Sequence, residues 1–226
     1  MHRQFGFQQP MHVLPNFLPE PDAKAAEQMP PGCAAPQRPF FLFVGRLERI
    51  KGLQDTIPLF NEQSPAELWI AGGGAYESAL RELAAGQRRV RFLGRLAEPE
   101  LRWLYRRACA LLAPSICYEV FPLVVLEAFR EATPVIARRL GPYPEIIEAS
   151  QGGLLFLSPA ELAAAVTRLA ADPALRTQLG QAARHAFQQR WSEDAVLDRY
   201  LALIEDVARR RGLDGLVRRL RPGYVR

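Results

Sequence analysis

The chain has 226 residues, 49% of them hydrophobic and 23% charged, which is the size and composition of a globular protein with a substantial core. It contains no apolar run near the roughly 18–20 residues that a membrane-spanning helix requires. The N-terminus also lacks the charged and then apolar profile of a signal peptide, so we expect a cytoplasmic protein.

The cysteines and histidines form no recognisable catalytic or metal-binding motif. No C-x-x-C spacing, His-Glu-x-x-His motif or Ser/His/Asp pattern occurs among them. We therefore expect no metal and no cofactor, and we regard hydrolases and metalloenzymes as unfavoured classes. The residues concerned are Cys33, Cys109, Cys117, His2, His12 and His185.

The formal net charge of +5 is concentrated at the C-terminus. Residues 207–226 hold seven arginines and one acid, Asp214, so this tail carries +6 and the remainder of the chain about −1. The tail is short and amphipathic and is able to contact an anionic membrane surface, such as the inner membrane surface, nucleic acid or an acidic partner; the alternative is a solvated and frayed terminus. We expect no nucleic-acid partner.

Residues 1–39 are rich in proline and glutamine and predict a linker rather than a domain, with at most one short strand near residues 11–14. From residue 40 onward, six short apolar runs alternate with helical patterns, as in a parallel sheet wound by right-handed crossovers. The expected strands are 40–44, 68–71, 90–93, 110–113, 134–137 and 154–157, and the expected helices among them are 53–61, 76–84, 98–108 and 123–131.

This alternation predicts an α/β fold, a Rossmann-like doubly wound parallel sheet of about six strands, over residues 40–190. In such sheets ligands bind at the carboxyl ends of the strands, near the switch in strand order. The chain then becomes helical, because Ser158 begins a capping box, Asp172 precedes the next helix and Ser192 caps a third. We expect residues 191–226 to form a closing helix and the basic tail.

Two carboxylates bracket the start of the apolar helix expected at 123–131. Glu119 lies in the loop before it, and Glu127 lies within it, where an unpaired buried carboxylate would be costly. Pro122 suits the first turn, so both carboxylates are positioned to face the space off the helix N-terminus and to accept hydrogen bonds from a ribose or a sugar. The alternative is structural: Glu127 caps or salt-bridges a neighbouring loop, and Glu119 is solvated.

Positive charge follows the first expected strand. Arg46 and Lys51 lead from it into the next helix, and two cations match the charge of a diphosphate. The alternative is that Arg46 pairs with Glu48 while Lys51 faces solvent. The second strand is followed by Gly72-Gly73-Gly74, which matches neither G-x-G-x-x-G nor a P-loop and indicates a tight turn or a close approach of backbone to a ligand.

These segments together resemble the C-terminal, donor-binding domain of GT-B retaining glycosyltransferases, in particular glycosyltransferase family 4, the glycosyl transferases group 1. The resemblance runs in register across residues 40–157, and the helices to about residue 210 resemble the closing segment of the family. The motifs that carry it are Gly45-Arg46-Leu47 with Lys51-Gly52, Leu68 to Gly74, Val90 to Gly94, Pro114-Ser115 with Glu119 to Glu127, and Thr133 to Ala137 with Glu145.

The resemblance implies a role for each matched residue. Arg46 and Lys51 would neutralise the diphosphate of a nucleotide-sugar donor, and Glu127 would accept hydrogen bonds from its ribose. Glu119, as the catalytic residue, would lie beside the transferred sugar. Transfer in this family is metal-independent and retains the anomeric configuration. The resemblance implies that five more residues complete the donor site: Gly94, Arg95 and Leu96 beside the nucleotide base, together with Phe121 and Leu123.

The chain departs from the family pattern at several points, among them Gly141-Pro142 where the family has Gly-Gly and Ala132 where it usually has glycine. Residues 119–123 read Glu-Val-Phe-Pro-Leu where the family usually has Glu-Gly-Phe-Gly-Leu, and the proline removes a backbone N–H donor. Residues 1–39 resemble only a connector to, or remnant of, the family's preceding acceptor-binding domain.

These departures leave several functional hypotheses. The first is the donor domain of a glycosyltransferase that is incomplete or that works with a separately encoded acceptor domain. The alternative is a non-catalytic nucleotide-sugar-binding or partner subunit that has lost turnover. Nucleotide-sugar epimerases share the architecture, but the chain shows no additional acid/base set for that reaction.

Overall fold

The centre of the protein is a parallel β-sheet, seen in a computed structural model that describes residues 6, 11–21, 26–213 and 215. The sheet has six strands in the order β3-β2-β1-β4-β5-β6. The predicted strands are confirmed, each within one residue at either end. They are β1 (Phe40–Val44), β2 (Glu67–Ala71), β3 (Val90–Gly94), β4 (Leu111–Ala113), β5 (Val135–Arg138) and β6 (Gly153–Phe156).

Helices cover both faces of this sheet. The α-helices are α1 (Leu53–Thr56), α2 (Glu77–Leu83), α3 (Glu98–Arg107), α4 (Leu123–Arg130), α5 (Tyr143–Ser150), α6 (Pro159–Ala171), α7 (Pro173–Arg190) and α8 (Glu193–Arg210). Phe40 and Leu42 of β1 pack in one apolar cluster with α3, α4, α5 and α7, whereas Phe41 and Phe43 pack in a second with α1, α2 and α6. Alternate residues of a strand face opposite sides, so the sheet is buried on both, which confirms the doubly wound α/β fold.

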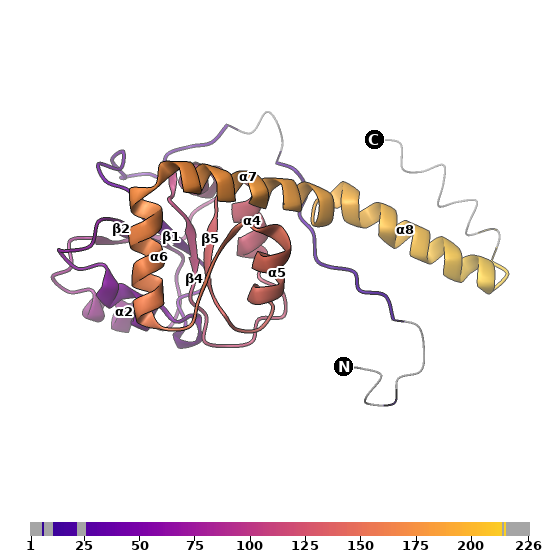
Figure 1. The fold of residues 1–226 in the computed structure, drawn as a ribbon, viewed down its shortest axis with the longest axis horizontal. Helices are drawn as coiled ribbons and strands as arrows, with labels where there is room; N and C mark the ends of the chain where they lie inside the picture. The colour runs from indigo at the N-terminus through magenta and orange to yellow at the C-terminus, as the bar shows by residue number, and fades with distance from the viewer. Residues whose placement is uncertain (1–5, 7–10, 22–25, 214, 216–226) are drawn as a thin grey trace.

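The three predicted starts of the C-terminal helices are confirmed. The side chains of Ser158, Asp172 and Ser192 each accept a hydrogen bond from the backbone N–H three residues later, at 3.2, 2.9 and 3.3 Å. These caps satisfy donors that the first turn of a helix leaves unpaired. Helix α8 follows α7 and extends away from the sheet, as Figure 1 shows.

Some local predictions were wrong. The single helix expected at 53–61 is the short α1 followed by a 3-10 turn at Ile57–Leu59, because Pro58 has no N–H with which to continue an α-helix. Pro122 precedes α4 instead of lying in its first turn. The prediction of at most one short strand near residues 11–14 is not contradicted: no strand forms there, and the β contact described in residues 11–21 is an isolated bridge between Leu18 and Ser192.

The basic tail is described only in part. Helix α8 ends at Arg210, and the arginines from residue 218 onward lie outside the described residues. Among the helices that the structure describes, none has the length and apolar character needed to cross a membrane.

Candidate functional site

The strand order reverses between β1 and β4, and the loops that follow these two strands are joined at the carboxyl edge of the sheet. The backbone N–H of Ile116 donates to the carbonyl of Ile50 at 2.8 Å. Gly52 has φ +77°, and a Cβ at that position would lie 2.1 Å from the carbonyl oxygen of Pro114. Only glycine therefore allows the two loops to approach so closely, and this contact brings the lysine after β1 beside the carboxylate after β4.

Lys51 and Glu119 form an ion pair at this junction. The Nζ atom of Lys51 lies 2.6 Å from Glu119 Oε1, which also accepts a hydrogen bond from Ser115 Oγ at 2.9 Å. Burial alone raises the pKa of Glu119, but the hydrogen bonds from Lys51 and Ser115 outweigh it and hold that pKa below its ordinary value. Cys117 Sγ, at 3.8 Å, also approaches Oε1, so the hydrogen bonds that Glu119 accepts from described residues all leave Oε2 available.

A cavity of about 420 Å³ opens over this ion pair. The first turn of α4 forms one wall with Leu123, and Phe121 and Arg46 also line it. The Arg46 guanidinium donates to Glu48 Oε1 at 2.7 Å and is 73% exposed. An exposed pair of this kind contributes little to stability, so the guanidinium remains available to an anionic ligand.

A second cavity, of about 470 Å³, adjoins the first across the end of β1. The two share Arg46 as a lining residue, and the second extends to Arg95 and Leu96 after β3. A Cβ on Gly72 would lie 1.9 Å from the carbonyl oxygen of Gly45, which explains the need for glycine in the loop after β2. The two cavities share residues 44–46 as lining and lie side by side along the carboxyl ends of β3, β2, β1 and β4.

Two of the sequence-predicted residues line neither cavity. Gly94 ends β3 with φ +72°, and Glu127 lies within α4. The Glu127 carboxylate accepts a hydrogen bond from the Tyr105 hydroxyl at 2.8 Å through Oε2. Burial, reinforced by the Glu127 charge, raises the pKa of Tyr105 well above its usual value, so the phenol stays protonated and donates. The structure therefore brings Arg46, Lys51 and Glu119 together but does not place Glu127 in their cavity.

Sequence reasoning missed Tyr143 as a site residue. Its side chain lines the same cavity as Lys51 and Glu119, and burial raises the pKa of Tyr143 to about 12, so the phenol is neutral at physiological pH. Tyr143 begins α5, a helix that the sequence did not predict. The available signal was its place after β5, since the loops that follow parallel strands meet at one edge of the sheet.

The family model described as "Glycosyl transferases group 1" matches residues 26–186, which is more than half of the chain. The chain belongs to the group 1 glycosyltransferases. The structural neighbours agree with this assignment. Sucrose-phosphate synthase from Thermosynechococcus elongatus aligns with a TM-score of 0.73 and 27% identity over 87% of this chain and 52% of that chain.

Other relatives of this glycosyltransferase chain match between 63% and 75% of its length. An uncharacterized glycosyltransferase of Methanocaldococcus jannaschii is 32% identical over 163 residues, which is 69% of this chain and 42% of the relative. A glycogen synthase of Mycobacterium tuberculosis is 38% identical over 152 residues, which is 63% of this chain and 36% of the relative. HepE of Anabaena, solved with UDP, shares the fold with a TM-score of 0.67, at 20% identity over 75% of this chain and 49% of that chain. The chain thus spans less than half the length of the curated relatives named here.

Proposed function

We propose that this chain is the donor-binding half of a glycosyltransferase and that its two adjoining cavities bind a nucleoside diphosphate sugar. One observation carries the proposal: an ion pair between Lys51 and Glu119 lies at the switch point of the sheet and lines a cavity. A cation and a carboxylate side by side suit a ligand that carries both an anionic group and hydroxyls. The switch point is also where ligands bind in open α/β sheets.

The proposed donor lies along the carboxyl edge of the sheet. Its diphosphate displaces Glu119 from Lys51 and draws in the exposed guanidinium of Arg46. The free Oε2 of Glu119 accepts hydrogen bonds from the transferred sugar, between the walls formed by Phe121 and Leu123. The base occupies the second cavity, which Arg95 and Leu96 line.

Glu127 is proposed to accept hydrogen bonds from the ribose. Its Oε2 is held by the Tyr105 hydroxyl, and in the described part of the chain Oε1 accepts none. Without a donor, Tyr105 holds one oxygen of the carboxylate and leaves the other unoccupied. Because Glu127 lines neither cavity, its contact with the ribose requires the side chain to move away from Tyr105 when the donor binds.

We further propose that transfer retains the anomeric configuration and requires no metal. When the bond between the anomeric carbon and the diphosphate breaks, negative charge develops on the leaving phosphate. Lys51 and Arg46 supply two positive charges at that position. Family resemblance supports this chemistry, and the geometry is compatible with it.

Calorimetric titration of the chain with UDP, GDP and ADP tests the proposal. We expect at least one of them to bind, and Lys51→Ala and Glu127→Ala each to weaken that binding by about tenfold or more, since each removes a charge-assisted contact. Arg168→Ala, an exposed arginine on α6, is the control and should leave the affinity unchanged. Absence of heat with all three nucleotides would overturn the proposal.

A second candidate is a non-catalytic nucleotide-sugar-binding or partner subunit. Pro122 favours it, because this residue removes a backbone donor at the start of α4, and Val120 beside it is 96% exposed. A separately encoded acceptor domain would restore activity in the first proposal but not in this one. Sugar transfer or donor hydrolysis by this chain, alone or with such a domain, would refute the second candidate.

The arginine-rich tail is proposed to contact anionic membrane surfaces weakly. Seven arginines against one acid in residues 207–226 supply the charge for such a contact. Cosedimentation with anionic vesicles, compared between the full chain and one lacking residues 209–226, tests this. Equal binding by the two chains would remove the idea.

A further inference from the structure

The second cavity, the one of about 470 Å³ after β3, is lined by polar side chains of a single kind. Of the described residues that line it, only Arg46 and Arg95 have polar side chains, and no acidic, amide or hydroxyl side chain is among them. Aliphatic side chains, including those of Leu96 and Leu101, and the glycines of two loops form the rest of the wall. A mostly apolar wall with few polar groups suits a flat ring whose orientation those polar groups decide.

Backbone contacts fix the loop that carries Arg95. Gly94, which precedes it, has φ +72°, a left-handed conformation that glycine adopts without strain. The carbonyl of Gly94 accepts a hydrogen bond from the N–H of Gly72 at 2.7 Å, so the end of β3 is tied to the loop after β2. A Cβ at Gly73 would lie 3.4 Å from Arg95 Nε and 3.7 Å from Arg95 Cγ. The Arg95 side chain therefore lies across the backbone of Gly73, at the wall of the cavity.

The guanidinium of Arg95 has no partner that a ligand would need to displace. Arg95 is exposed and makes no hydrogen bond or ion pair with the residues that the structure describes. Glu77 also approaches Gly73, but it pairs with Arg81 at 2.8 Å and does not line the cavity. Since Arg46 is assigned to the diphosphate, Arg95 is the charged side chain that remains for the base.

A guanidinium offers N–H donors and no acceptor, so it distinguishes bases by the groups on their edges. Uracil, like thymine, presents the carbonyl oxygen O4, and guanine presents O6 and N7, all of which accept hydrogen bonds. Cytosine and adenine carry an amino group in place of that carbonyl oxygen. An amino group facing Arg95 would set donor against donor and leave both unpaired, which lowers the affinity of such a nucleotide.

We propose that Arg95 selects the base of the sugar donor, so that the site takes a uridine or guanosine diphosphate sugar in preference to a cytidine or adenosine one. This inference rests on the proposed donor site. Arg95 donates to the carbonyl oxygen of the base, and to N7 as well when the base is guanine, while Leu96 and Leu101 pack against the ring. Arg95 is thus a specificity-determining residue that does not contact the reacting atoms.

The test is calorimetric titration with two pairs of nucleotides, UDP against CDP and GDP against ADP, and with inorganic pyrophosphate. In at least one pair we expect the carbonyl-bearing nucleotide to bind about tenfold or more tightly than its amino-bearing partner. Arg95→Gln replaces the guanidinium by an amide that both donates and accepts. It should weaken binding of the preferred nucleotide about tenfold, bring the two members of the pair to similar affinity, and leave pyrophosphate binding unchanged.

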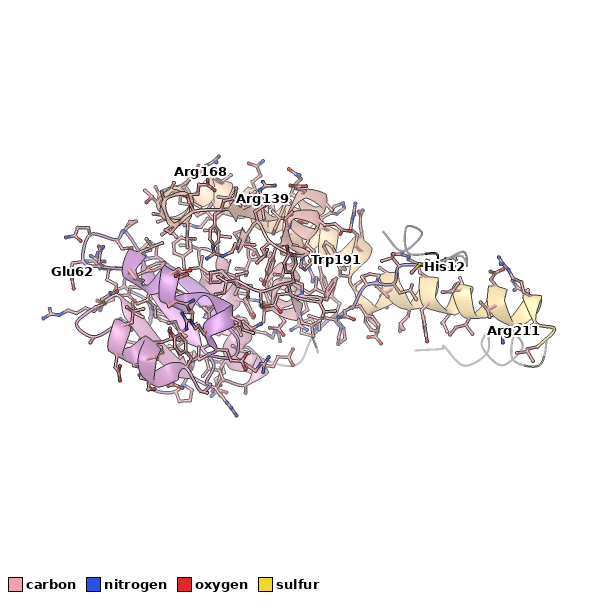
Figure 2. The ribbon with its side chains drawn as sticks, turned by 90° about the horizontal axis from the view of Figure 1, so that it is seen from below. His12, Glu62, Arg139, Arg168, Trp191 and Arg211 are labelled. Carbon is pink, nitrogen blue, oxygen red and sulfur yellow. The ribbon has the colours of Figure 1, made fainter. Side chains whose placement is uncertain are left out.

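Arg168→Gln is the matched control, because it makes the same exchange at an exposed arginine of α6 that lines neither cavity, and Figure 2 shows Arg168 at the outside of the protein. It should leave every affinity unchanged. Equal affinities within both pairs, or tighter binding of CDP and ADP than of their partners, would overturn the proposal. An equal loss of nucleotide and pyrophosphate affinity in Arg95→Gln would also overturn it, because Arg95 would then bind phosphate.

The pyrophosphate titration separates failure of this inference from failure of the donor site. If pyrophosphate binds and the four nucleotides bind no more tightly than pyrophosphate does, the base does not occupy the second cavity and the selection by Arg95 is refuted. The diphosphate contacts proposed for Lys51 and Arg46 would stand in that case. If neither pyrophosphate nor any nucleotide binds, the proposed donor site itself is refuted, and this inference with it.

Discussion

Glu119 and Glu131 are both carboxylates held by basic side chains, but they differ in how fully they are satisfied. Glu131, directly after α4, has a side chain that is 1% exposed. Arg102 donates to its Oε1 at 3.2 Å and Arg106 donates to its Oε2 at 2.6 Å, while Arg130 Nε lies 3.6 Å from Oε1. Glu119 in contrast is 18% exposed and receives its contacts through one oxygen only.

The contrast shows which feature marks a ligand site. A cavity does not distinguish the two, because one of about 520 Å³ borders Glu131 as well. What differs is the free oxygen of Glu119 and a single lysine that can change partners. A buried carboxylate whose two oxygens are both paired stabilises the fold only while its partners are present, whereas a carboxylate paired through one oxygen at a cavity can release its cation to a ligand.

The largest effect is expected from Glu131→Gln. Removing the charge leaves the buried Arg102 beside a neutral amide, whereas Arg130 keeps its ion pair with Glu98 at 2.9 Å. Breaking a buried ion pair costs about 3–5 kcal/mol, and we expect the lower end of that range. Chemical denaturation measures the loss. The matched control is Glu148→Gln, whose exposed pair with Arg139 should contribute well under about 1 kcal/mol. Similar losses of stability in the two variants would mean that the Glu131 ion pairs contribute no more to folding than an exposed ion pair does.

The second-largest effect is expected on the affinity for UDP, in the variant Glu119→Gln. This change releases Lys51 and removes a negative charge next to the proposed diphosphate, so UDP should bind up to about tenfold more tightly. Calorimetry measures the change, again with Glu148→Gln as the control. Unchanged or weaker binding of UDP would show that the carboxylate does not compete with the diphosphate for Lys51.

Much of the fold could be predicted because its signals are local. Each strand is a short apolar run buried on both faces. Ser158, Asp172 and Ser192 each precede a helical pattern, and serine and aspartate commonly cap helices at that position. Prediction failed where one residue broke the pattern. Pro58 ended a helix early, and the short α5, which contains Pro144 and follows Pro142, gave too weak a periodicity to be recognised.

The site was predictable only in part, because its contacts are not local. Lys51 and Glu119 are 68 residues apart, and they meet because β4 lies next to β1 in the sheet. The sequence pattern placed both at strand ends without showing that they would pair with each other. The partner of Glu127 could not be predicted at all, since Tyr105 comes from α3 and no motif marks it.

A smaller change in the free energy of unfolding is expected from a substitution at Ala132, the residue that follows Glu131. Ala132 has φ +57°, a left-handed conformation that costs an L-residue about 1–2 kcal/mol and that glycine adopts freely. Ala132→Gly should therefore raise the free energy of unfolding by about 1 kcal/mol, as measured by chemical denaturation. Ala164→Gly, at an exposed position inside α6, is the control and should lower it by about 0.5–1 kcal/mol. A loss of stability in Ala132→Gly would mean that the network imposes no strain on this turn.

The smallest expected effect is a pH dependence of the stability that the ion pair between Glu119 and Lys51 contributes. The pKa of Glu119 is lower in the folded protein than its ordinary value, because Lys51 and Ser115 donate hydrogen bonds to the carboxylate and outweigh the effect of burial. Its ion pair therefore adds stability above the unfolded pKa and loses that contribution as the pH falls through the folded pKa. We expect the difference in unfolding free energy between the wild type and Glu119→Gln to be constant from pH 7 to about pH 5 and to shrink below it. Because solvent screens this pair, the change should amount to a few tenths of a kcal/mol up to about 1 kcal/mol, and to less at high salt. If the difference in unfolding free energy stays constant down to pH 3, Lys51 does not hold the Glu119 carboxylate in its ionised form. The proposal that the diphosphate displaces Glu119 from Lys51 would then lose its support.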